Sequence, residues 1–135
     1  MAVQLSTTVR NARLDAIETA IGASAVLKIR TGAAPANCGT ADSGTVLATL
    51  SLPSDWMAAA SSGSKAKSGT WEDASADNAG TAAHFRVYAS DGTTCHLQGT
   101  VTATGGGGDM TLDNVSIGAG QAVTITGFTL TDGNA

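Results

Sequence analysis

The sequence is short of the residues that most binding and catalytic functions require. Aromatic residues make up 4% of its 135 residues and charged residues 13%, about half the ~25% usual in soluble domains. The seven lysines and arginines are scattered and form no basic stripe for nucleic acid. No apolar run approaches the ~18 residues that span a bilayer. We therefore expect neither nucleic acid nor a membrane as a partner, and a weakly charged surface that packs against other protein.

Signals for secretion and for disulfide bonds are equally sparse. The N-terminal stretch MAVQLSTTVRNARLDA carries polar and charged residues where a signal peptide needs an apolar segment, which predicts synthesis in the cytoplasm. Cys38 and Cys95 are the two cysteines. A reducing compartment favours free thiols, although the even count also permits a disulfide.

One segment has the pattern of a helix. Residues 6–21 place apolar side chains at three- and four-residue steps, with Ser6 as N-cap and Gly22 after the last turn. The apolar positions form two sets: Val9, Ala12, Ala16 and Ala20, and Leu14, Ile17 and Ile21. The charged side chains are expected to face water or a partner: Arg10, Arg13, Asp15 and Glu18.

Everything after residue 22 is typical of β-structure. The clearest pair is 82–89 with 93–104, joined at Asp91-Gly92, a strong hairpin signal. It places Phe85 and Val87 on one face of its first strand. The segments 109–117 and 121–131 are predicted to form another pair. We expect a mainly β, single-domain antiparallel β-sandwich of the jelly-roll kind, with residues 1–22 as an N-terminal arm and helix and 23–135 as the sandwich.

The four glycines at 105–108 raise the question of a phosphate-binding loop. Such a loop needs a lysine and a following helix. Here Asp109 follows, no lysine is near, and the next segment has a strand pattern. We predict a strand-to-strand turn in which glycine supplies positive φ.

No other motif indicates catalysis, a metal or a cofactor. His84 and His96 with the two cysteines lack the spacing of zinc ligands. No GxSxG motif or convincing pair of catalytic carboxylates occurs. Oxygen ligands for calcium are conceivable in two clusters that match no known loop: Asp73, Asp77 and Asn78, and Asp109, Asp113 and Asn114. We expect no catalytic residue, no cofactor and no bound metal.

The few aromatic residues divide between core and surface roles. Phe85 and Phe128 lie in alternating strands and are expected in the core. Trp71 borders an acidic loop, and Tyr88 lies on the face opposite Phe85. Both are therefore candidate interface aromatics, with a core role as the alternative for Trp71.

The order of the segments resembles a family of small virion proteins of tailed bacteriophages. The resemblance is carried by LSTTVRNARLDAIETAIG, LKIRTGAAPAN, GTVLATLSL, GTAAHFRVYASDGT and GTVTATGGGGDMTLDNVSIGAGQAVTITGFTLT, and it covers residues 5–131. It implies a β-rich, non-enzymatic structural protein of the virion. A cement or decoration protein on the capsid surface is the main expectation, bound to an HK97-type major capsid protein and to itself as a dimer or trimer. The family carries no established site residues to transfer.

The expected contacts lie at the chain ends and on the helix. Residues 1–8 and 131–135 are natural arms for neighbouring subunits. The candidate interface residues are Val3, Leu5, Arg10, Arg13, Trp71 and Tyr88. Two alternatives remain open: a tail, neck or fibre component of the virion, and a carbohydrate-binding module, which would present Trp71 and Tyr88 on one sandwich face.

Overall fold

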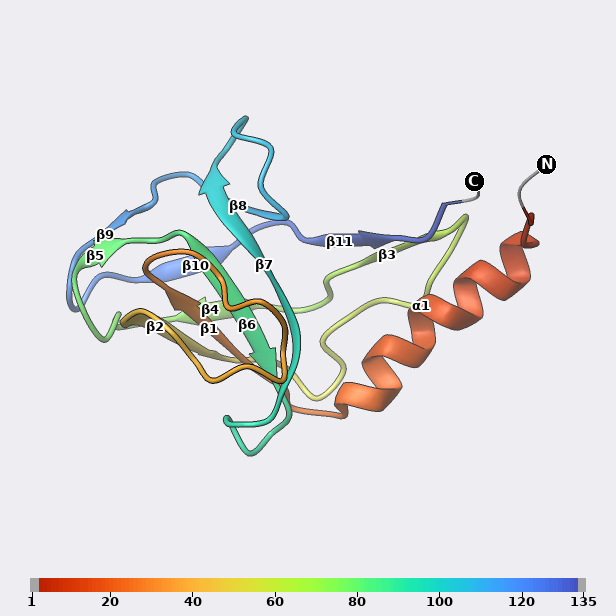
Figure 1. Ribbon diagram of the computed structural model, residues 1–135, viewed down its shortest axis with the longest axis horizontal. Helices are drawn as coiled ribbons and strands as arrows, with labels where there is room; N and C mark the ends of the chain where they lie inside the picture. Colours follow the sequence, from red (N-terminus) through yellow and green to blue (C-terminus); the bar gives the residue numbers. More distant parts are fainter. Residues whose placement is uncertain (1–2, 134–135) are drawn as a thin grey trace.

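The protein is one helix followed by short strands. The computed structural model describes residues 3–133. Strands make up 36% of the structure and helix 11%. The elements, in chain order, are α1 (Thr7–Ile21), β1 (Val26–Arg30), β2 (Val46–Ser51), β3 (Ser64–Ala66), β4 (Trp71–Asp73), β5 (Gly80–Thr81), β6 (His84–Tyr88), β7 (Cys95–Ala103), β8 (Met110–Leu112), β9 (Ser116–Ile117), β10 (Val123–Ile125) and β11 (Thr129–Thr131). The predicted mainly β, sandwich-like domain with an N-terminal helix is confirmed (Figure 1).

The largest sheet has five strands in the order β2-β1-β6-β7-β8. The predicted hairpin is its centre: β6 and β7 pair antiparallel, with Arg86 opposite Gln98. The turn between them contains Gly92 at φ 71°, the left-handed conformation that an Asp-Gly turn needs. Asp91 accepts the backbone N–H groups of Thr93 and Thr94 and stabilises that turn.

The prediction that segments 109–117 and 121–131 pair with each other is wrong. Strand β8 pairs parallel with β7, and β9 pairs with β5. Strand β10 instead pairs antiparallel with β4, about 50 residues earlier in the chain, and β11 pairs antiparallel with β3, about 65 residues earlier. The strands that pair with β9, β10 and β11 all lie within residues 64–81, where the sequence has only weak strand patterns. Turn chemistry alone therefore could not select them.

The glycines at 105–108 form the turn that the sequence predicts. They connect β7 to β8, and Gly105 and Gly107 have φ of 87° and 80°. A Cβ on Gly106 or Gly108 would lie within 3 Å of the Thr102 side chain. Glycine is needed here because the chain folds tightly back over β7 so that β8 can run parallel to it.

A row of aromatic rings joins the layers of the sandwich. Trp56 packs on Trp71, Trp71 on Phe128, and Phe128 on Phe85, with ring centroids 5.9, 5.8 and 5.6 Å apart. Phe85 comes from the five-stranded sheet, whereas Trp71 lies in β4 on the opposite layer. Such tilted and edge-on contacts add to the free energy of burying the rings. The core thus depends on four aromatic side chains set among leucine, isoleucine, valine, methionine and alanine.

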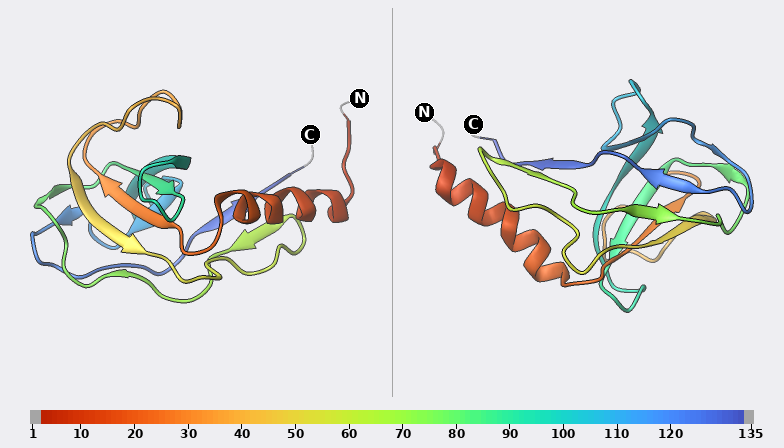
Figure 2. Two further views of the ribbon diagram at one scale, coloured as in Figure 1. Left: turned by 90° about the horizontal axis from the view of Figure 1, so that it is seen from below. Right: turned by 180° about the vertical axis from the view of Figure 1, so that it is seen from behind.

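Helix α1 and the β3–β11 pair extend together from one side of the sandwich. Figure 1 and the rear view in Figure 2 show the helix beside this two-stranded ribbon, with the start of α1 near the end of β11 at the tip of the extension. Ser6 caps the helix by accepting the N–H of Val9, and Gly22 ends it at φ 94°. The N-terminal helix and the C-terminal strand therefore belong to one structural unit.

Candidate interaction surface

The polar side of helix α1 faces inward. Asn11, Asp15 and Glu18 are spaced so that they lie on one face of the helix. Their side-chain oxygens accept the backbone N–H groups of three residues of the segment that precedes and enters β3. The pairs are Asn11 with Gly63 (2.8 Å), Asp15 with Ala60 (2.9 Å) and Glu18 with Met57 (2.6 Å). The helix thus takes the place of a neighbouring strand for this irregular segment.

Lys65 fixes the same face to strand β3. Its side chain is almost completely buried, and its Nζ lies 2.7 Å from an Asp15 oxygen and 3.6 Å from a Glu18 oxygen. It also donates to the carbonyl of Ala58 (2.9 Å). The hydrogen bonds from Lys65 and from the Ala60 N–H lower the pKa of Asp15. The prediction that Asp15 and Glu18 are left to water or a partner is therefore wrong for Glu18, which is 21% exposed, and only partly right for Asp15, which is 47% exposed but also bonds groups of the same chain.

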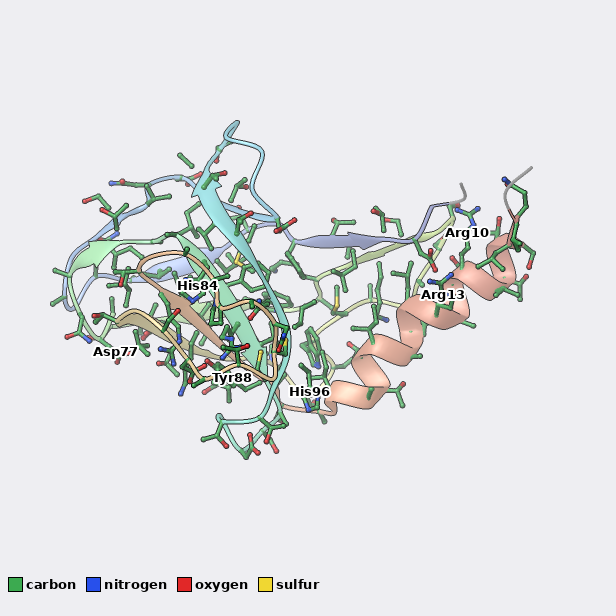
Figure 3. The ribbon with its side chains drawn as sticks, viewed as in Figure 1. Arg10, Arg13, Asp77, His84, Tyr88 and His96 are labelled. Atoms are coloured by element: carbon green, nitrogen blue, oxygen red, sulfur yellow. The ribbon has the colours of Figure 1, made fainter. Side chains whose placement is uncertain are left out.

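Arg10 and Arg13 connect the helix to the end of the chain. Arg10 Nη1 donates to the Asp132 carbonyl at 3.0 Å, and Arg13 Nε lies 3.2 Å from the Asp132 carboxylate. The Arg13 side chain is 59% exposed, whereas Arg10 is half-buried. Figure 3 shows both arginines on the N-terminal half of the helix, on the side toward β11. Arg13 thus keeps donors free for a partner, whereas Arg10 mainly holds the two chain ends together.

One of the two apolar sets of the helix faces solvent. Val3 is 83% exposed and Val9 44% exposed, and these are the exposed large hydrophobic residues in the described part of the chain. Ala12, Ala16 and Ala20 share a helix face with Val9 and are also exposed, whereas Val3 lies in the segment before the helix. We name this set of five residues the outer helix surface. Of the two apolar sets in the sequence, only the one with Leu14 and Ile21 is buried against the protein.

The remaining predicted interface residues are placed differently. Leu5 is half-buried. Trp71 and Tyr88 are both completely buried, so the prediction that they present rings to a partner is wrong. Trp71 lies in the aromatic row of the core, and its indole N–H donates to the carbonyls of Trp56 and Ser68. Parts of the predicted arms, residues 1, 2, 134 and 135, lie outside the described residues.

Tyr88 is buried because a loop covers its face of the sheet. The loop of residues 31–45, between β1 and β2, lies over the outward side of β6. All five β6 residues are buried, including the polar His84 and Arg86. The alternation read from the sequence is present, but both faces of the strand are covered.

Asp42 is the centre of the contacts beneath this loop. It accepts hydrogen bonds from Arg30 Nη2 (2.9 Å), Tyr88 OH (2.7 Å) and Arg86 Nη1. Arg86 also donates to the carbonyls of Asn37 and Thr40 at 2.9 and 3.0 Å. Although burial opposes it, the hydrogen bonds from Tyr88 and Arg86 hold the pKa of Asp42 below its usual value. We call Asp42, Arg30, Arg86 and Tyr88 the loop clasp.

Three of the aspartates considered as calcium ligands have partners within the fold. Asp73 accepts the Thr49 N–H, Asp77 the Thr49 hydroxyl, and Asp109 the Thr100 N–H and hydroxyl. Buried His84 contacts the Gly32 carbonyl through Nδ1 (2.7 Å), whereas His96 is exposed. Within residues 3–133, no group of three or more His, Cys, Asp or Glu side chains is arranged to hold a metal ion. The same range contains no helix long and apolar enough to cross a membrane.

The inward polar face of the helix left one signal in the sequence. Asn11, Asp15 and Glu18 share a helix face with Leu14 and Ile21. This face therefore combines acceptor side chains with apolar ones, where a helix face that packs on a core is usually apolar. Nothing local shows that their partners are backbone N–H groups of residues 57–63. Comparison with protein-family models, with curated proteins and with solved structures gave no match.

Proposed function

We propose that this protein is a structural component of a tailed-bacteriophage particle, a cement or decoration protein that binds the shell of major capsid protein. The proposal rests on the sequence resemblance together with one structural observation, the outer helix surface. A helix that turns its carboxylates inward and its Val and Ala side chains outward leaves apolar area in water. Apolar side chains exposed in this way are typical of a helix that another protein covers in the assembled state.

The free energy of binding expected for one copy is small, as for weak contacts that are repeated over a symmetric shell. Full burial of a valine side chain contributes about 1.5–2 kcal/mol. Because Val3 is 83% exposed and Val9 44% exposed, covering both contributes about 2 kcal/mol per copy. The alanines allow a partner backbone to approach the helix closely. Arg13, at the edge of this surface, has an exposed guanidinium for a carboxylate of the partner. Repetition by symmetry turns such modest contacts into a large stabilisation of the shell.

Binding of the purified protein to mature, undecorated shells tests the proposal. We expect sedimentation with shells at micromolar concentration and higher resistance of the shells to heat. Ala16→Glu, which puts a charge in the middle of the outer helix surface, should weaken binding at least about tenfold. Ala79→Glu is the matched control, because Ala79 is exposed in the loop before β5, at the end of the sandwich away from the helix. Equal binding by both variants would contradict the assigned surface, and absence of binding by the wild type would contradict the function.

Copy number separates the capsid from other places in a virion. Quantitative mass spectrometry of purified particles should give this chain in a simple ratio to major capsid protein. A handful of copies per particle would instead indicate a tail, neck or fibre component. The carbohydrate-binding alternative loses the feature on which it depended, since neither Trp71 nor Tyr88 presents its ring at the surface.

A further inference from the structure

The loop of residues 31–45 brings the two cysteines of the chain together. Gln98 Nε2, on strand β7, donates to the Pro35 carbonyl at 2.6 Å. Arg86 Nη2, on β6, donates to the Asn37 carbonyl at 2.9 Å. These two contacts place the peptide that leads into Cys38 directly over the β6–β7 hairpin.

Cys95 lies under the same part of the loop. It is the first residue of β7 and is paired with Tyr88 of β6, whose hydroxyl donates to Asp42 of the loop. The Cys95 thiol interacts with the Cys38 thiol, and the Arg86 guanidinium is near enough for its charge to act on Cys95. Both cysteines are half-buried, and both carry free thiols. The loop is thus held on either side of Cys38 by contacts to the two strands of the hairpin.

We propose that Cys38 and Cys95 are an oxidative modification site, at which a small-molecule disulfide such as oxidised glutathione converts the two thiols into an intramolecular disulfide that locks the loop over the sheet. The site is independent of the proposed function. In a reducing compartment the thiols stay free, and they become oxidised when the protein passes into an oxidising one.

The reaction proceeds by two thiol–disulfide exchanges. Burial and the neighbouring Cys38 thiol raise the pKa of Cys95 to about 12, so the first attack is assigned to Cys38. The Cys38 sulfur, after losing its proton to solvent, attacks one sulfur of glutathione disulfide and releases one glutathione. Cys95 then loses its proton, attacks the Cys38 sulfur of the mixed disulfide and releases the second glutathione. Two electrons pass from the protein thiols to glutathione disulfide, which leaves as two glutathione molecules.

Mass spectrometry after oxidation tests the proposal directly. The native protein is incubated with oxidised glutathione, quenched with N-ethylmaleimide and unfolded. We expect a monomer that has lost two hydrogen atoms, binds no maleimide and yields a peptide linked through Cys38 and Cys95. Cys95→Ser is expected to stop at the glutathione adduct of Cys38. Wild-type protein that ends as a glutathione adduct, as a disulfide-linked dimer or with both thiols unreacted would overturn the proposal.

A second measurement tests whether the fold itself brings the sulfurs together. The equilibrium between free thiols and disulfide is measured in glutathione redox buffers, in native buffer and in urea. If the native loop favours the bond, disulfide formation is at least about tenfold more favourable in native buffer, and by reciprocity the oxidised protein melts several degrees higher than the reduced protein. An equal constant in both solutions would show that the fold does not favour this bond and would refute the locking of the loop.

Discussion

Replacing Asp42 with alanine should be among the most damaging single changes in this protein. The Arg86 side chain is 2% exposed and the Arg30 side chain 7% exposed, and Asp42 is the one carboxylate that forms ion pairs with either of them in the described structure. Truncating one partner of a buried ion pair typically costs about 3–5 kcal/mol, because the remaining charge stays buried. The Asp42 side chain is 38% exposed, so water can reach part of the vacated space. We therefore expect a loss of about 3 kcal/mol, at the low end of that range.

Urea denaturation and thermal melting measure this loss. For a chain of this length, about 3 kcal/mol corresponds to a fall of roughly 10 °C in melting temperature. Asp42→Asn keeps the shape and an acceptor oxygen but removes the charge, and should lose about half as much. Asp55→Ala, which truncates an exposed aspartate, is the control and should change stability by less than about 0.5 kcal/mol.

The acid side of the stability curve provides an independent check. The pKa of Asp42 is lowered in the folded protein, so its contribution is present above the unfolded pKa of about 3.9 and is lost as the pH falls below it. The difference between wild type and Asp42→Asn should therefore shrink as the pH falls from about 5 toward 2. A loss below about 1 kcal/mol for Asp42→Ala at neutral pH, or a pH-independent difference from Asp42→Asn, would refute the role given to the loop clasp.

Three further predictions concern the loop clasp, the helix contact and the turns. Burial and the hydrogen bond to Asp42 raise the pKa of Tyr88, the single tyrosine of the chain. Ultraviolet titration should therefore give a midpoint above 10 in the wild type and a lower midpoint in Asp42→Asn. The contribution of Tyr88 to stability is lost as the pH rises through that midpoint. Lys65→Ala should lower the free energy of unfolding by about 3 kcal/mol and speed amide hydrogen exchange in α1. Lys65→Met keeps most of the packing and should lower it by less. Equal losses of stability in the two variants would contradict a packing contribution of the Lys65 side chain. Gly44→Ala should destabilise the protein by more than about 2 kcal/mol in urea denaturation, because the new Cβ would lie 2.0 Å from a carbonyl oxygen. Gly107→Ala also has a positive φ but meets no neighbouring atom, and should cost about 1 kcal/mol. Similar losses for the two variants would contradict the steric argument.

The two polar clusters have different consequences for assembly. The loop clasp fixes a loop on the sandwich, whereas the contacts of Lys65 fix the orientation of α1. Weakening the clasp should therefore leave shell binding by folded protein unchanged. Loss of the Lys65 contacts would release the helix from this orientation. The outer helix surface thus depends on Lys65 and on the three acceptors Asn11, Asp15 and Glu18.

The sequence by itself determined the elements that rest on local chemistry. The capped helix that ends before Gly22, the Asp91-Gly92 hairpin and the glycine turn at 105–108 each follow from capping, turn geometry or positive φ within a few residues. The burial of Phe85 and Phe128 follows from alternation along their strands. These predictions hold because the interactions that decide them join near neighbours in the chain.

The tertiary structure alone decided which surfaces are covered. Periodicity showed two apolar sets on the helix but not which one is buried, because Asp15 and Glu18 are satisfied by backbone N–H groups of residues 57–60. Alternation placed Tyr88 opposite Phe85 but could not show that the loop carrying Asp42 covers it. Strand partners between residues 64–81 and 116–131 were equally hidden. In each case the deciding contact joins segments far apart in the chain, and no local pattern specifies it.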